Sequence, residues 1–247
     1  MSFTVTHRHQ QKGSRIRRLA FPLLLLGFAL SAHARPLDIR SENLEPIRNG
    51  RPRPPILAPV GATNLLSLGC AVTSSTPAPL IGELSYITDG DKENETYASI
   101  PPGNNPLVKL GDGIQWVQVD LGATQHVYGV CVWRYHEFPQ IYRDVIVKLS
   151  SDPDFIDGVT TVFNNDHDNS SYMGQGSDKE YLETNEGRPI PVPGIRARYV
   201  RVYSNGSHAD GRIDPANHYT EIEVYGGTPT SEEKIPIRIE LPKPTFM

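Results

Sequence analysis

The sequence is poor in methionine, cysteine and tryptophan, with 3 Met, 2 Cys and 2 Trp among 247 residues. Few blocks of Ala, Leu, Glu and Lys occur, and 21 Gly and 22 Pro interrupt the chain. This composition weakens a helical-bundle interpretation and favours many short elements joined by turns. Hydrophobic residues at 38% and charged residues at 21% indicate a globular chain rather than a disordered or multi-span membrane protein.

Positive charge is scarce beyond the first 34 residues, which hold five of the 24 Lys and Arg residues and none of the 28 Asp and Glu residues. The rest of the chain is therefore more acidic than the overall net charge of −4 indicates. Acidic chains are unsuited to nucleic-acid backbones and to anionic lipid surfaces. We expect a neutral partner or a cation, with no nucleic acid and no membrane insertion.

An apolar run, residues 19–30, lies near the N-terminus between a basic segment and the small residues Ala32 and Ala34. This arrangement is typical of a cleaved signal peptide over residues 1–34, because the run is short for a membrane span. We expect a secreted protein, either periplasmic or extracellular.

The two cysteines leave two alternatives open. In an oxidising compartment Cys70 and Cys131 could pair, closing a loop of about 60 residues and stabilising the fold by about 4 kcal/mol in the chain-entropy description. Alternatively they are two independent buried thiols, since Cys131 falls within a strand pattern. Spacing alone does not decide between them.

Composition divides the chain into four parts. The signal peptide (1–34) is followed by a proline-rich linker (35–63), a region of short alternating segments (64–226) and an extended C-terminal tail (227–247). The tail contains a piece, residues 235–241, that could form a strand.

Alternation of apolar and polar residues dominates the third part. In residues 116–121, Val117, Val119 and Leu121 share one face, which is typical of a half-buried strand. Similar patterns occur at 144–149, 198–203 and 221–225, with a more continuously apolar run at 127–133. No helix is expected, and strands at this spacing predict an all-β antiparallel sandwich or barrel.

Five motifs in series resemble a known family: NLLSLGCAVTSS (64–75), TDGD (88–91), QWVQVDLG (115–122), RYVRVY (198–203) and EIEVYG (221–226). Together they resemble the discoidin-like (coagulation factor 5/8 type C) domain, close to the family 32 carbohydrate-binding modules of bacteria. The resemblance implies a jelly-roll β-sandwich with galactose-binding-like topology, one structural calcium ion and ligand loops at one rim. The disulfide that joins the two ends of the animal domains is not expected, because Cys131 lies in mid-domain.

The resemblance also implies a set of calcium ligands. They map to Asp89, Asp91, Thr96, Thr220 and Glu221. Segment 89–96 does offer carboxylates, carbonyls and a hydroxyl, the oxygen ligands that Ca²⁺ prefers, although its spacing does not match an EF-hand. The segment between Asp91 and Thr96 is two residues longer than the common family pattern. A solvated acidic turn is the alternative.

Segment 133–143 concentrates aromatic rings, an imidazole and two guanidinium groups between predicted strands. Its candidate ligand contacts are Arg134, His136 and Arg143. Aromatic faces stack on sugar rings while fixed polar groups satisfy hydroxyls, and in the resembled family this loop helps to form the glycan site. The alternative is that Trp133 and Tyr142 are core residues and that Arg143 caps a turn.

Two further loops carry candidates. In the polar run 164–171, His167 and Asp168 could line a sugar pocket, although the run could instead hold a second cation or be a solvated turn. His218 and Tyr219 precede the last predicted strand and are expected at one rim of the sandwich. A structural role for His218 is the alternative.

The sequence lacks the GxSxG, HExxH and CxxC patterns of common hydrolases and redox proteins. We therefore expect no enzyme, but a secreted non-catalytic carbohydrate-binding module with structural Ca²⁺, whose partner is a glycan or polysaccharide. The alternative is a protein-interaction or cell-envelope adhesion module of the same fold. Its partners would be other envelope or secreted proteins, with the tail adding a strand to a partner's sheet.

Overall fold

The computed structural model describes residues 41, 43–48, 50–93, 107–209 and 211–242. The chain divides into two compact units, Met1–Pro36 and Leu37–Met247, and every described residue belongs to the second. The expected signal peptide therefore lies outside the described residues. Among those that are described, no helix has the length and apolar character needed to cross a membrane.

Regular structure in the described residues is almost entirely β-strand, apart from one short 3-10 helix, η1 (Leu84–Thr88). The strands are β1 (Leu57–Pro59), β2 (Asn64–Leu65), β3 (Ala71–Ser74), β4 (Val108–Asp112), β5 (Gln115–Trp133), β6 (Ile141–Tyr142), β7 (Ile146–Ser150), β8 (Thr160–Asn164), β9 (Arg188–Ser204), β10 (Ser207–Ala209), β11 (Arg212–Asp214), β12 (Ala216–Tyr219), β13 (Glu221–Gly226) and β14 (Lys234–Pro236).

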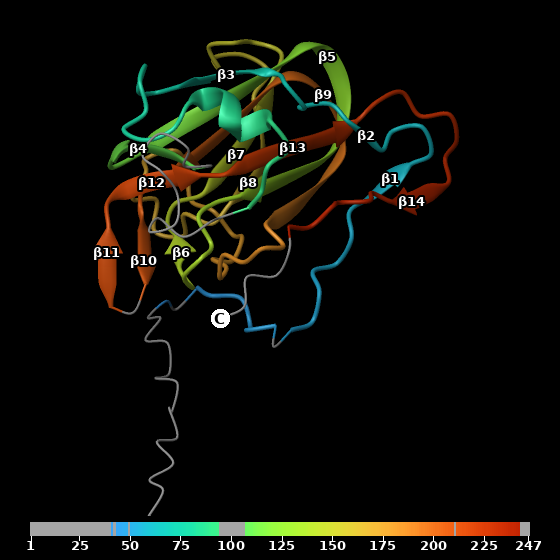
Figure 1. The fold of residues 1–247 in the computed structure, drawn as a ribbon. Coiled ribbons are helices and arrows are strands. Elements are labelled where there is room, and N and C mark those ends of the chain that lie inside the picture. Colours follow the sequence, from blue (N-terminus) through green and yellow to red (C-terminus); the bar gives the residue numbers. More distant parts are fainter. Residues whose placement is uncertain (1–40, 42, 49, 94–106, 210, 243–247) are drawn as a thin grey trace, which may run out of the picture. The chain divides into compact units, whose positions relative to one another are not determined.

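Most of the long strands join one antiparallel sheet in the order β2-β13-β5-β9-β7-β8, with β3 paired to β5 (Figure 1). The two longest, β5 and β9, change neighbours along their length. The first half of β5 pairs with β3 and with the end of β9, and its second half pairs with β13 and with the start of β9. Register shifts in β5 separate the halves. Each long strand thus serves both layers of an antiparallel β-sandwich, and this confirms the expected fold class.

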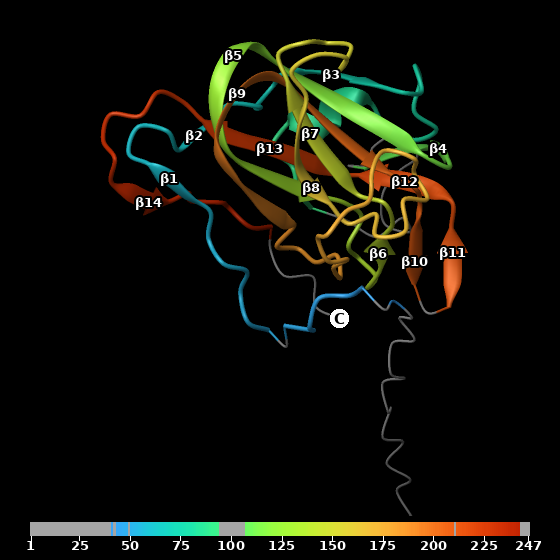
Figure 2. The same ribbon diagram turned by 180° about the vertical axis from the view of Figure 1, so that it is seen from behind.

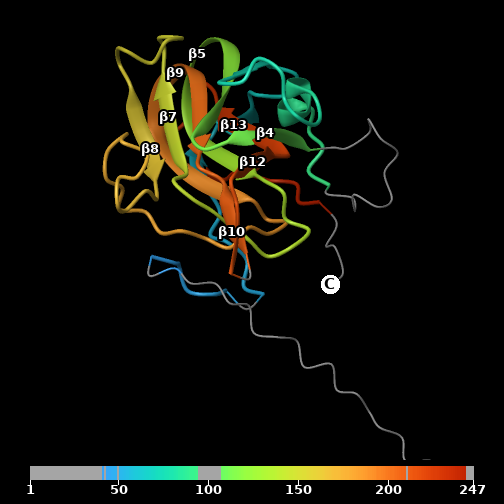
Figure 3. The ribbon, with the colours of Figure 1, turned by 90° about the vertical axis from the view of Figure 1, so that its left-hand side faces the viewer.

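A second pair, β4 and β12, and a small sheet of β6, β10 and β11 complete the sandwich region. Figure 3 shows β7 and β8 on one side of β9, with β4 and β12 on the other. In Figures 1 and 2 the connection from β7 to β8 lies at one end of the sandwich, and β6, β10 and β11 lie at the other. The second end is called the β6 end below.

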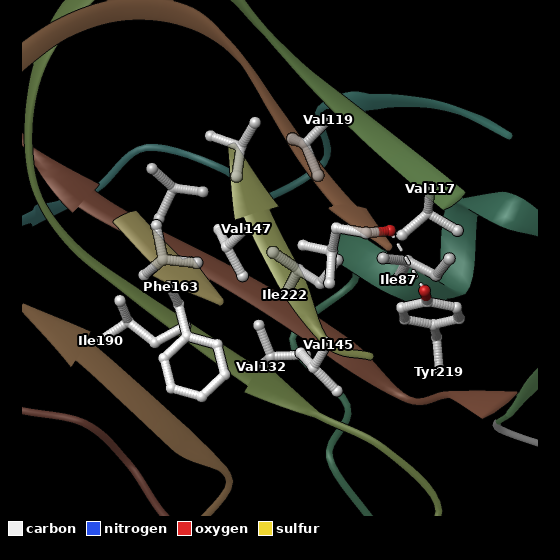
Figure 4. Close-up of a cluster of buried hydrophobic side chains, with 14 of the residues drawn as sticks. Ile87, Val117, Val119, Val132, Val145, Val147, Phe163, Ile190, Tyr219 and Ile222 are labelled. Carbon is white, nitrogen blue, oxygen red and sulfur yellow. Dashed lines mark hydrogen bonds between the residues drawn. The ribbon is translucent and has the colours of Figure 1, made fainter. Parts of the chain in front are cut away.

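The core is built from the alternating residues that the sequence indicates. Val117 and Val119 of β5 are fully buried, as are Val147 of β7 and Ile222 of β13. They pack with Val145, Phe163 and Ile190 in one apolar cluster (Figure 4). Burial of this many aliphatic side chains supplies the main driving force for the fold.

Parts of both flanking segments fold against the sandwich. β1 lies within the region expected to be a linker and pairs antiparallel with β14 of the tail. Ile56 and Ile237, beside these strands, pack with Tyr225 in a second apolar cluster. Gly129 of β5 makes this contact possible, because a Cβ there would lie 2.8 Å from Ile56. The tail strand thus has a partner within its own chain.

The cysteines are two independent thiols in the structure. Cys70 is half-buried, and Cys131 is fully buried within β5. Burial raises the pKa of both thiols, most strongly for Cys131, which also faces the charge of Glu223. Neither group has the electropositive setting that activates a cysteine.

Candidate functional site

The expected calcium ligands meet where η1 ends against β13. Asp89 follows the last turn of η1, and the N–H of the next residue, Gly90, donates to Oε2 of Glu221 at 3.1 Å. The N–H of Asp91 donates to Oδ1 of Asp89 at 2.8 Å. The structure therefore brings Asp89 and Glu221 together from segments far apart in the sequence. Thr96 lies outside the described residues.

The Glu221 carboxylate is buried, and its Oε1 has no hydrogen-bond partner within the described part of the chain. Burial, followed by the charges of Glu223 and Asp89, raises the pKa of Glu221 to about 9. Burial also raises the pKa of Asp89, with the Asp91 charge adding to the effect. A buried carboxylate with an orphaned oxygen, close enough to Asp89 to feel its charge, fits a hard divalent cation, which would favour the charged forms of both groups.

The neighbouring cation, Lys92, is committed to other groups. Its Nζ lies 2.6 Å from Oε1 of Glu223 and 5.0 Å from the centre of the Trp133 ring. It also donates to the carbonyl of Glu240 in the tail at 2.9 Å. Glu223 is thus neutralised by Lys92, whereas Glu221 accepts only the Gly90 amide among the described residues. Thr220 lies beside this pair, with its N–H donating to the Trp133 carbonyl at 3.0 Å.

An aromatic cluster forms at the β6 end, where the segment after β5 meets β12. The ring of Tyr135 lies 6.2 Å from that of Phe138 and 6.1 Å from that of His218. Phe138 is 60% exposed, and Tyr135 is half-buried. The buried ring of Tyr142 in β6 packs against His218, with ring centres 6.4 Å apart. The cluster therefore exposes the ring of Phe138, while Tyr142 and His218 are buried beneath the surface.

His218 supplies a polar group to this cluster. Burial, with a contribution from Lys109, lowers its pKa to about 4, so the imidazole is neutral at neutral pH. Its Nε2 lies 4.0 Å from Oδ2 of Asp214, and its Nδ1 has no hydrogen-bond partner in the part of the chain that the structure covers. A neutral imidazole can both donate and accept a hydrogen bond.

Two expected ligand contacts, Arg134 and Tyr219, lie in the interior. Arg134 is fully buried, and its guanidinium lies 4.7 Å from the Tyr142 ring centre and 4.4 Å from that of Tyr219. It donates to the Ser204 hydroxyl at 2.8 Å. The Tyr219 hydroxyl donates to the Val202 carbonyl at 3.1 Å, the dashed line in Figure 4. Neither side chain reaches the surface, so both support the rim from within.

His136 and Arg143 flank the aromatic cluster. His136 is 9% exposed, and its Nδ1–H donates to the Arg134 carbonyl at 2.8 Å. Burial lowers its pKa. Arg143 follows β6 and donates through Nη2 to the Asn205 carbonyl at 2.8 Å. Both side chains thus hold backbone in place at the β6 end.

The polar loop after β8 gathers three carboxylates. Oxygens of Asp144, Asp166 and Asp168 lie within 4.8 Å of one another and could hold a metal ion. Asp144 accepts hydrogen bonds from Asn205 at 2.7 Å and from Ser170 at 3.0 Å. The single backbone N–H of Ser170 is shared between Oδ1 of Asp166 and Oδ1 of Asp168, at 3.0 Å from each. The three carboxylates therefore already accept several hydrogen bonds from the protein. His167 and Asp168 themselves are exposed.

The sequence pointed to the aromatic segment 133–143, but neither Tyr135 nor Phe138 within it was expected as a ligand contact, and Asp214 was not considered. Their residue types are common in loops and cores alike, and only the fold shows that Phe138 is exposed and that Tyr135 lies between its ring and His218. A usable signal was present, because Phe138 precedes a proline between two predicted strands. A large apolar residue in such a turn is a candidate for a surface contact.

No protein-family model matches the chain, and none of the curated proteins does. Solved structures that resemble it include family 32 carbohydrate-binding modules. A chitosan-binding module of a chitosanase/glucanase from Paenibacillus sp. IK-5 is 21% identical and has a TM-score of 0.43, covering 66% of this chain and 99% of that one. The CBM32 of AlyQ, solved in complex with 4,5-unsaturated mannuronic acid, is 20% identical and has a TM-score of 0.38, covering 62% of this chain and 92% of that one.

A module from Clostridium perfringens, CpGH89CBM32-4, was solved in complex with GlcNAc-alpha-1,4-galactose. It is 17% identical and has a TM-score of 0.42, covering 66% of this chain and 96% of that module. These TM-scores are below 0.5, so the fold is not assigned from these structures. It is assigned from the strand pairing of this chain, which forms an antiparallel β-sandwich.

Proposed function

We propose that this chain is an exported, non-catalytic carbohydrate-binding module with a structural calcium ion. The observation that carries the proposal is the 60% exposed ring of Phe138, which lies 6.2 Å from the ring of Tyr135 at the β6 end; His218 lies 6.1 Å from Tyr135 in turn. An open aromatic ring next to fixed polar groups is the arrangement that sugar recognition uses. The sequence motifs that resemble family 32 modules support the same function.

Each group in the proposed site has a distinct role. The Phe138 ring stacks on the C–H face of a sugar, as an apolar surface with defined geometry. The Asp214 carboxylate accepts hydrogen bonds from hydroxyls, and His218, which is only 6% exposed and whose Nδ1 is buried, contributes through Nε2, 4.0 Å from Oδ2 of Asp214. Arg143, His167 and Asp168 are proposed as further contacts from neighbouring loops, while His136 orients the backbone under the site.

Calcium is proposed to stabilise the sandwich rather than to contact the sugar. Asp89 and Glu221 would hold it with carboxylate oxygens, and the carbonyls of Asp91 and Thr220 are the further ligands that the family resemblance assigns. The bound ion would supply charge compensation, linking the segment after η1 to β13. Because it binds the folded state, it raises stability in proportion to its occupancy.

A non-catalytic role is supported by the carboxylates of the polar loop. Asp144, Asp166 and Asp168 accept hydrogen bonds from residues of the loops around them, which is a structural use of these groups. The strand-addition alternative is less favoured, since β14 pairs with β1 of the same chain. The proposed partner is therefore a glycan or polysaccharide.

The test is affinity electrophoresis of the protein through gels that contain a panel of neutral and acidic polysaccharides, with calcium and with chelator. We expect retardation by at least one polysaccharide and loss of it in Phe138→Ala. Ile156→Ala is the matched control, since Ile156 is 79% exposed in the connection from β7 to β8 at the opposite end (Figure 1). Unretarded migration in every gel would refute the proposal.

A further inference from the structure

A cavity of about 420 Å³ lies outside the sandwich, between the segment before β1 and the segment before β9. Its walls include Leu44, Pro46 and Ile47 from the first segment, Leu182 from the second and Leu241 from the tail. The volume falls in the range of small-molecule sites. Ile47 and Leu241 are 60% and 51% exposed, so apolar side chains remain open to a ligand there.

The first segment is fixed to the sandwich by charged contacts. Oε1 of Glu45 lies 2.6 Å from Arg53, and Oε2 lies 2.7 Å from Arg188 of β9. The N–H of Glu45 donates to the Glu180 carbonyl at 2.8 Å. Arg53 also donates to the Leu182 carbonyl at 3.2 Å, which joins the two walls. The cavity is therefore a built feature of the fold and not a gap beside a loose segment.

The rim of this cavity is positively charged. Arg48 donates to the carbonyls of Arg51 and Pro52, and Arg51 donates through Nε to the Arg48 carbonyl. Within the described ranges neither guanidinium pairs with a carboxylate. The lining holds three arginines against two acidic residues, Glu186 and Glu45, and Glu45 is already shared by two arginines. A chain with a net charge of −4 thus places unneutralised guanidinium groups beside an apolar cavity, which favours an anionic ligand.

The walls also discriminate between kinds of anion. None of the described residues that line the cavity is aromatic, so a sugar ring would find no stacking surface. A second cavity of about 170 Å³ shares Arg53, Glu186 and Leu241 with the first and continues along Ile237 and Ile239. The two cavities together offer an extended aliphatic surface, and Arg48 and Arg51 line the first cavity alone.

We propose that this aliphatic surface binds a single-chain fatty carboxylate. The aliphatic chain lies against Ile47, Leu182 and Leu241, and the carboxylate pairs with Arg51 and Arg48 at the rim. This site shares no lining residue with the proposed glycan site, and its occupant is held by an aliphatic chain rather than by a sugar ring. Binding neither requires nor produces any covalent change.

Calorimetric titration of the protein with octanoate and decanoate, each below its micelle concentration, tests the proposal. Two further methylene groups should tighten binding about fifteenfold, since each contributes about a fourfold gain. Decyltrimethylammonium, which has the same chain and the opposite charge, should bind at least tenfold more weakly than decanoate. Equal affinity for the two decyl compounds, or no heat with decanoate, would overturn the proposal.

Two variants assign the site. Arg51→Glu should weaken decanoate at least tenfold, and Leu241→Ala should remove most of the difference between octanoate and decanoate. Arg196→Glu is the control, because Arg196 is an exposed arginine on β9 that lines neither cavity. Equal affinities of the Arg51 and Arg196 variants for decanoate would contradict the proposal. So would flotation with phosphatidylglycerol vesicles that excess decanoate fails to reverse, because it indicates a membrane surface as the partner.

Discussion

Glu221 of β13 accepts a hydrogen bond from the backbone N–H of Gly90 at 3.1 Å, which ties the segment after η1 to a strand 131 residues further along the chain. The second oxygen of the same carboxylate is buried without a partner among the described residues. This relationship is the structural basis for the proposed calcium ion, because a buried carboxylate beside Asp89 needs positive charge to stay ionised.

Calcium should raise the melting temperature of the protein. At calcium concentrations about 100-fold above Kd, preferential binding to the folded state adds about 2.7 kcal/mol, or about 5–10 °C for a chain of this size. Differential scanning calorimetry in calcium and in chelator measures the shift. A wild-type melting temperature that is the same in both would contradict the calcium proposal.

A pair of variants locates the calcium ion. Glu221→Gln should abolish the calcium-dependent shift, because it removes the buried charge that the ion compensates. Asp168→Asn should keep the shift, since Asp168 belongs to the separate carboxylate cluster of the polar loop. Loss of the shift in Asp168→Asn, with retention in Glu221→Gln, would move the ion to that cluster.

Arg134→Ala should destabilise the fold rather than remove a ligand contact. The guanidinium fills the space between Tyr142 and Tyr219 and bonds Ser204, so its removal should cost about 3 kcal/mol or more. Urea denaturation measures the change. The exposed Arg196→Ala should change stability by less than about 0.5 kcal/mol. An Arg134→Ala protein as stable as the wild type would show that this interpretation of the buried arginine is wrong.

Glu183 should make stability depend on pH. Burial raises its pKa to about 7, although Arg134 and Arg53 act in the opposite direction. A carboxyl whose pKa is raised by folding favours the folded state below pH 4.5, and this contribution is lost as the pH rises through about 7. Between pH 5 and pH 8, the free energy of unfolding should therefore fall by about 2–3 kcal/mol more in the wild type than in Glu183→Gln.

The comparison for Glu183 is made by denaturant titration at several pH values. Other titrating groups, such as His136, contribute equally to both proteins and cancel in the difference. Parallel pH profiles for the wild type and Glu183→Gln would contradict the expected titration.

Alternating apolar residues were sufficient to predict the sandwich strands. Val117 and Val119, Val147 and Ile222 are buried as their alternation indicates, because the two faces of a strand meet different surroundings. The pairing of β1 with β14 was not predicted. It depends on contact between segments about 180 residues apart in the sequence, and the prolines in both are typical of linkers.

The candidate sites show a similar limit. The segment of Asp89 lies against Glu221 through the Gly90 N–H, and the assignment of both residues as calcium ligands, which stays a prediction, required the order of motifs rather than any local pattern. Arg134 and Tyr219 have side chains of the kind that bind sugars and were expected as ligand contacts, yet both are buried. Whether such a side chain is buried or exposed depends on packing between distant strands, and residue type alone does not determine it.

The most direct test of the central claim is calorimetric titration with an oligosaccharide of the polysaccharide that retards the protein most. We expect saturable binding by the wild type, binding about tenfold weaker by Phe138→Ala at an unchanged melting temperature, and unaltered binding by Ile156→Ala. Equal affinities of the wild type and Phe138→Ala for the oligosaccharide would contradict the claim that the β6 end holds the glycan site.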